Sequence, residues 1–123
     1  MNPVLIKNNT AETAVEPHRI VKFGSDDGLV VQAAAASDLS VGVSDGLGAE
    51  ANGRVDVVRV GIADVEYGGA VTRGARLTSD ADGKAITASP AAGANAQIIG
   101  TAEISGVSGD IGKVLINPSV MQG

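Results

Sequence analysis

The stretch Ala75-Arg-Leu-Thr-Ser-Asp-Ala-Asp-Gly-Lys-Ala-Ile-Thr87 has the pattern of a β-hairpin. Its centre, Asp82-Gly83, is a dipeptide that tolerates positive φ and closes tight turns between antiparallel strands. The flanking segments Arg76–Thr78 and Ala85–Thr87 contain the β-branched and apolar residues that favour strands. This hairpin is the strongest local signal in the chain, and it predicts β structure around it.

Similar turn-forming dipeptides recur along the chain. Dipeptides of the Asp-Gly and Asn-Gly type predict tight turns that depend on four glycines, Gly28, Gly46, Gly53 and Gly83. The expected strands between the turns are Arg19–Phe23, Leu29–Ala33, Ser40–Ser44, Arg54–Val60, Ile62–Tyr67, Ala75–Thr78, Lys84–Ala88, Gln97–Ile104 and Gly112–Asn117. Short strands with such spacing indicate an all-β fold, either a small β-barrel or a β-sandwich of short antiparallel strands.

Two features leave alternatives open. Residues Val31–Leu39, with Ala33 to Ala36 at their centre, suit a short turn of helix or equally a strand edge with small side chains. Separately, residues 40–46 and 99–106 are weakly alike, and each places a glycine inside an expected strand. Glycine in a strand usually marks a bulge, a barrel corner or a close backbone approach. These two segments are interpreted as similar β segments and not as an established repeat.

The N-terminal residues differ in composition from the rest. An apolar patch, Val4, Leu5 and Ile6, is followed by a polar run that ends at Pro17. We therefore expect an extended N-terminal arm, residues 1–17, and a single β domain, residues 18–123. The ordered core is expected to begin near Pro17, and the arm to dock on a neighbour by adding to an exposed sheet edge.

Composition limits the class of protein. The chain has 123 residues, which fits one domain, and hydrophobic residues make up 44% of them. With one Phe, one Tyr and no Trp, the core must consist of small side chains, so partner contacts are expected to add burial. A net charge of −5 argues against nucleic-acid binding, which needs a positive footprint. No apolar run predicts a membrane span, and the N-terminus does not resemble a secretory signal.

Two motifs resemble known chemical sites. Gly42-Val-Ser-Asp-Gly46 matches the nucleophile elbow of hydrolases, but the only histidine, His18, lies upstream and no helix is expected to follow. Asp80-Ala-Asp82 resembles the start of a calcium loop but lacks the other spaced ligands, so a hairpin turn explains it. No cysteine is available for thiol or zinc chemistry. The sequence therefore predicts no catalytic residue, no metal and no cofactor.

Arginines stand out in an acidic chain. Their planar side chains bond carboxylates at two points, which favours them at interfaces. Arg59, Arg73 and Arg76 are the candidates for contacts with a partner or another subunit, together with the apolar patch Val4, Leu5 and Ile6.

The assembled pattern resembles small capsid decoration, or cement, proteins of tailed bacteriophages. The likeness covers roughly residues 15–120 and rests on the order of strands and turns. The segments that carry it are Arg19–Ala33, Ser40–Asp45, Arg54–Ala70, Val71–Thr87, Ile98–Glu103 and Gly109–Ile116.

The resemblance implies an all-β, non-enzymatic protein that binds the outer surface of a phage head and stabilises the expanded shell. Its expected partners are the major capsid protein and itself, as a homo-oligomer, most often a trimer, without nucleic acid or membrane. The expected location is the outer capsid surface of a virion, after synthesis in the bacterial host cytoplasm. The alternatives are a virion-surface ligand- or carbohydrate-binding β domain, which usually needs aromatic platforms, and an enzyme with an unrecognised site.

Overall fold

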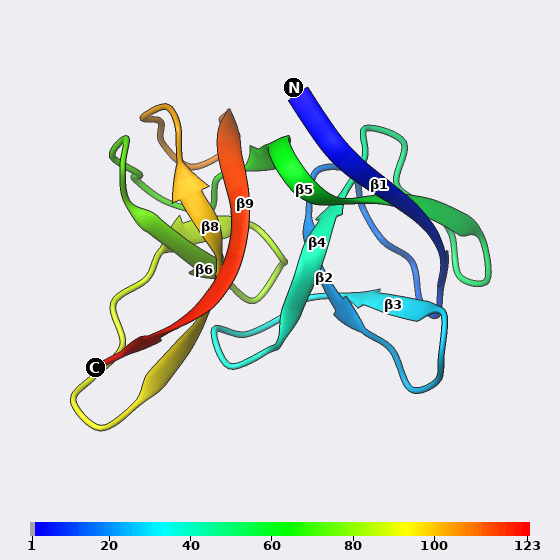
Figure 1. Ribbon diagram of the computed structural model, residues 1–123, viewed down its shortest axis with the longest axis horizontal. Helices are drawn as coiled ribbons and strands as arrows, with labels where there is room; N and C mark the ends of the chain where they lie inside the picture. Colours follow the sequence, from blue (N-terminus) through cyan, green and yellow to red (C-terminus); the bar gives the residue numbers. More distant parts are fainter. Residues whose placement is uncertain (1) are drawn as a thin grey trace.

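The structure is a computed structural model that describes residues 2–123, with side chains described from Leu5 onward. The described residues contain strands, turns and loops but no helix (Figure 1). The strands are β1 (Asn2–Ala11), β2 (Ile20–Phe23), β3 (Leu29–Gln32), β4 (Ser40–Ser44), β5 (Arg54–Glu66), β6 (Arg76–Ser79), β7 (Ala85–Thr87), β8 (Asn95–Ala102) and β9 (Ile111–Gln122).

The all-β prediction is confirmed, and of the two predicted architectures the structure has the small β-barrel. Strands β1, β3, β2, β4 and β5 are hydrogen-bonded in that order, and β1 also pairs with β5, which closes a five-stranded barrel. Every pairing in it is antiparallel except β1 with β3. Residues 33–39, the alternative helical turn, form a loop in which the Asp38 carboxylate accepts the Ala34 N–H at 2.8 Å.

The remaining strands repeat the connectivity of the barrel. In the first half, β2 pairs with β3 and with β4, and β4 pairs with β5. In the same way, β6 pairs with β7 and with β8 in the second half, and β8 pairs with β9. The second half of β5 pairs with β9 as β1 pairs with β5. A parallel bridge between Tyr67 and Ala85 takes the place of the parallel β1–β3 pairing. The long strand β5 therefore ends the first half-structure and begins the second, with Gly61 (φ 103°) at the changeover.

Backbone hydrogen bonds show the same duplication in detail. Val15 and Ala49 exchange two bonds of 2.8 Å, and Val71 and Gly106 exchange two of 2.9 and 3.0 Å. Positive φ values recur at matching places, described as pairs of first-half and second-half residues: His18 (59°) with Gly74 (92°), Gly28 (79°) with Gly83 (74°), and Asn52 (67°) with Gly109 (93°). Since main-chain geometry repeats at these bridges and turns, the weak likeness between residues 40–46 and 99–106 is part of an internal duplication.

Two of the four expected turn glycines do not have the expected conformation. Gly28 and Gly83 have positive φ, but Gly46 and Gly53 do not. In the turn after β4 the left-handed residue is Gly48, at 63°. Before β5 it is Asn52, at 67°, because an asparagine side chain tolerates this region.

Each half has its own core. The first-half core consists of Ala11, Val15, Val21, Val30, Val55 and Val57. The larger core lies in the second half and extends across to Ile20, Val43 and Val58 of the first, and it includes the fully buried Tyr67. The side chain of the single tyrosine therefore packs in the core of the second half, where its hydroxyl donates a 2.7 Å hydrogen bond to the Ile104 carbonyl. Burial raises the pKa of that hydroxyl.

The ordered core begins earlier than the sequence suggested. Strand β1 pairs with β5 from Asn2 to Thr10, and Ala11 and Val15 are buried in the first-half core. The polar run was misleading because its side chains bond at the barrel surface: the Asn8 amide donates to the Asp56 carboxylate at 2.9 Å. The stretch is extended as predicted, but it forms a wall of the barrel.

Candidate interaction surface

The apolar part of β1 lies on the outside of the barrel beside other exposed apolar side chains. Leu5 is paired with Val60 of β5, and Ile62 with Leu115 of β9. Leu5, Ile6, Val60 and Leu115 are each about half exposed. These four side chains are called the apolar strip. The Val4 side chain, which belongs to the predicted patch, lies outside the described side chains.

The strip borders an open strand edge. Strand β1 pairs with β3 only at Thr10 and Ala11, so within the described chain the pairings of residues 2–8 lie on the β5 side alone. An unpaired edge offers backbone N–H and C=O groups to another chain. Apolar side chains beside such an edge form a surface for strand addition.

The three predicted arginines make different contacts. Arg59 lies 5.8 Å from the Phe23 ring centre and donates to the Asn9 side chain at 3.3 Å. The exposed Arg76 donates to Ser119 at 2.9 Å, whereas the Arg73 backbone N–H donates to Ser105 at 2.9 Å. Within the described part of the chain none of the three pairs with a carboxylate. Their guanidinium groups retain capacity for an acidic partner.

Sequence analysis missed half of the strip. Val60 and Leu115 are exposed although apolar residues close to them in the same strands, Val58 and Val114, are buried in the core. Both faces of β5 contain apolar side chains because it contributes to two cores, so alternation alone does not distinguish the exposed positions.

The residues weighed as chemical sites have structural partners. The buried Ser44 hydroxyl donates to the Glu16 carbonyl at 2.7 Å and accepts the Arg19 N–H at 3.0 Å. His18 Nδ1 lies 3.2 Å from the Asp64 carbonyl. The Asp80 carboxylate accepts backbone N–H groups within its own turn. No group of three or more metal-ligating side chains occurs among residues 2–123.

Charged side chains also join the two halves. Glu66, on β5, contacts Arg19 of the first half at 3.3 Å and Lys84 of the second at 3.2 Å. Burial raises the pKa of the Glu66 carboxyl, but the Lys84 and Arg19 cations outweigh this and hold the pKa below its ordinary value. The cluster therefore fixes one half against the other.

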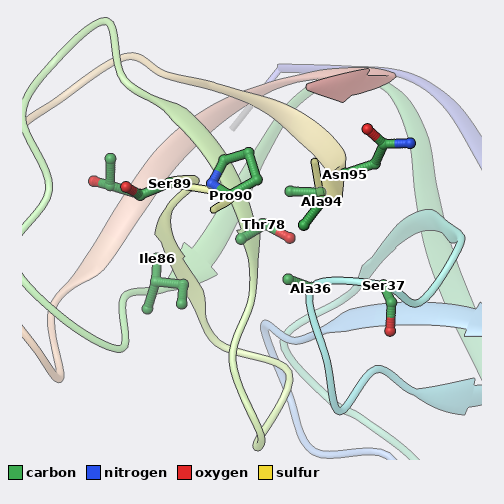
Figure 2. A pocket seen from close by; sticks show the side chains of 10 residues that line it. Ala36, Ser37, Thr78, Ile86, Ser89, Pro90, Ala94 and Asn95 are labelled. Carbon is green, nitrogen blue, oxygen red and sulfur yellow. The ribbon is translucent and has the colours of Figure 1, made fainter. Parts of the chain in front are cut away.

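A cavity of about 490 Å³ lies between the loop after β3 and strands β6 to β8 (Figure 2). Figure 2 shows Ala36 of the loop across the hollow from Thr78 and Ala94. None of the ten lining side chains is charged or aromatic. The lining therefore supplies neither a titratable group for catalysis nor a ring for stacking on a sugar.

Comparison with known proteins places this molecule among structural components of phage heads. The family model described as phage cement protein matches residues 2–115, so the chain belongs to the phage cement protein family. The fold is similar to that of the N base of the head fiber protein gp8.5 of bacteriophage phi29, seen in a crystal structure. That similarity has a TM-score of 0.71 at 17% sequence identity and covers 97% of this chain and 98% of the other. No curated protein matches the sequence.

The family establishes the role at a coarse level. The chain is a capsid decoration protein, a virion component on the phage head that binds the capsid and stabilises it. Residues 2–123 contain no helix long and apolar enough to cross a membrane.

Proposed function

We propose that this protein binds the major capsid protein on the outer surface of the head through the apolar strip and the free edge of β1. The observation that carries the proposal is the coincidence of the two features: half-exposed Leu5 and Ile6 lie on a strand with one unpaired edge. Leu5 and Ile6 then have two roles, because they lie on a strand that closes the barrel and their exposed side chains face the shell.

The proposed action is mechanical and needs no catalytic step. A protein that binds the expanded lattice more tightly than the precursor lattice shifts that equilibrium and stabilises the expanded shell by mass action. Many copies bind one shell, and each copy adds a small contribution to the free energy that stabilises the expanded state. Burial of the strip supplies the binding free energy, since each apolar side chain removed from water contributes about 1.5–3 kcal/mol when fully buried.

The double variant Leu5→Asp/Ile6→Asp tests this role. We expect its affinity for shells that lack the protein to fall by roughly 100-fold or more, because two charges replace apolar contacts. Binding is measured by cosedimentation with the purified shells. Val120→Asp is the matched control: Val120 is a similarly exposed apolar residue of β9 outside the strip. If the double variant binds like the control, the strip is not the docking surface.

We also propose that the protein forms trimers on the shell, with Arg59, Arg73 and Arg76 near the subunit contacts. The number three comes from the likeness to decoration proteins, and the contacts from guanidinium groups without a carboxylate partner in the described chain. A reconstruction of decorated shells tests this. Clusters of three copies in mutual contact are expected, whereas isolated copies contradict the trimer.

A further inference from the structure

The loop after β4 presents an exposed leucine on a fixed turn. The Leu47 side chain is 87% exposed, the highest value among the large hydrophobic side chains described. The Asp45 carboxylate accepts the backbone N–H groups of Leu47 and Gly48 at 3.1 and 3.2 Å. Gly48 has positive φ and packs so closely that an added Cβ would lie 2.5 Å from the Val15 carbonyl oxygen. Leu47 is therefore held outward by a turn with little freedom.

The second half presents apolar side chains at the matching place, in the loop between β8 and β9. Val107 is 60% exposed and Ile104 about half exposed. This loop is also fixed: Tyr67 donates to the Ile104 carbonyl at 2.7 Å, and the Asp110 carboxylate accepts the Val107 N–H at 3.0 Å. The paired bridges described above, Val15 with Ala49 and Val71 with Gly106, anchor the two loops at equivalent positions.

Both loops lie at the same edge of the molecule. In Figure 1 the loop after β4 and the loop after β8 are at the upper edge, on either side of the N-terminal end of β1. In this view the N-terminal end of β1 lies between the two loops, which the duplication relates to each other. A surface that presents one feature twice matches a partner that also presents one site twice, and a shell built from many copies of one protein is such a partner.

We propose that the chain is a two-point clamp: the Leu47 loop docks on one shell subunit, and the Ile104–Val107 loop docks on the equivalent apolar site of the adjacent subunit. This inference rests on the proposed function, because it assumes that the shell is bound through this edge. Strand β5 pairs in both halves and so links the two points, and the second contact therefore forms at high effective concentration once the first is made. A clamp of this kind joins neighbouring subunits, which a single-point contact does not do.

The test uses the full chain with Leu47→Asp, Ile104→Asp/Val107→Asp and all three substitutions together, each checked for folding by circular dichroism. Loss of one point is expected to weaken shell binding on the order of 100-fold, and loss of both to remove detectable decoration. Each one-point variant is then added at concentrations that restore full occupancy. It is expected to leave shells as heat-sensitive as undecorated ones, because it occupies subunits without joining them.

Several results would overturn the clamp. It is wrong if a one-point variant at full occupancy protects shells like the unmodified chain, or if substitution of only one loop has an effect. It is also wrong if Leu39→Asp weakens binding equally, since exposed Leu39 lies outside both loops. Binding of the unmodified chain reports separately on the proposed function: if that chain does not bind shells, the proposed function fails before the variants are compared.

Discussion

Gly112→Val is expected to prevent stable folding, and a second substitution, Tyr67→Ala, is expected to restore it. A Cβ on Gly112 would overlap the ring of Tyr67, which is fully buried and also crowds Gly106, where a Cβ would lie 2.8 Å from the ring. Overpacking usually costs about 1–3 kcal/mol, and more where neither group can move. Here the ring is fully buried and held by its hydroxyl bond to the Ile104 carbonyl, so moving it aside would break that bond.

The rescue follows from the internal duplication. The strand registers place Val55 opposite Asn9 and Gly112 opposite Val65, so Val55 and Gly112 are equivalent positions. Asn9 and Val65 are therefore equivalent too, and two residues further along Ala11 is the first-half equivalent of Tyr67; both are fully buried. The first core therefore has a small residue beside a valine where the second has a tyrosine beside a glycine. The double variant builds the first arrangement into the second half.

Unfolding in urea measures the effect. Tyr67→Ala alone is expected to lower the free energy of unfolding by about 3–5 kcal/mol, because it leaves a large cavity. Against a typical total of about 5–15 kcal/mol, Gly112→Val alone should leave little folded protein. The double variant should be more stable than the sum of the single effects by about 2 kcal/mol or more. Additive effects would mean that the two side chains do not share one site.

The duplication explains why sequence reasoning found the strands but not the repeat. Eight of the nine strands were expected near their observed positions, with β5 divided at Gly61, because turn dipeptides and branched residues mark them locally. The repeat lies in the main chain: equivalent bonds and φ values persist while side chains change. Where Ala11 and Val55 in one half correspond to Tyr67 and Gly112 in the other, residue identity is lost although packed volume is kept.

The missed strand and the missed surface residues have different physical causes. Strand β1 is held by its backbone pairing with β5, which a polar run such as Lys7–Thr10 does not reveal. The exposure of Val60 depends on how the two halves are arranged, and no local pattern encodes that arrangement. Leu5 and Ile6 were found because they stand alone beside a polar run.

Substitution of three turn glycines by valine is expected to give a graded loss of stability, with Gly83→Val the most severe. Gly46 does not have positive φ, and an added Cβ would meet only the His18 ring at 3.5 Å. Gly28 has a φ of 79° but open space around it, so valine there is strained without being crowded. Gly46→Val is the control without backbone strain, and Gly28→Val is the control with strain alone.

Gly83 combines strain with crowding at the junction of the two halves. Its φ is 74°, and a Cβ would lie 2.8 Å from the Gln32 side chain and 3.2 Å from the Ile20 carbonyl oxygen. Its own carbonyl accepts the Ile20 N–H at 2.8 Å, so the turn cannot withdraw without losing that bond. The left-handed conformation costs a residue with a Cβ about 1–2 kcal/mol, and the crowding adds about 1–3 kcal/mol.

The three variants are compared by their urea midpoints under one set of conditions. Gly46→Val should change the free energy of unfolding by less than about 1 kcal/mol, Gly28→Val by about 1–2 kcal/mol, and Gly83→Val by about 3 kcal/mol or more. Equal losses for Gly28→Val and Gly83→Val would mean that the contact between the second-half turn and strands β2 and β3 does not stabilise the fold. That contact joins one half of the chain to the other. The difference in free energy of unfolding between Gly28→Val and Gly83→Val therefore also reports how much the contact between the two halves contributes to stability.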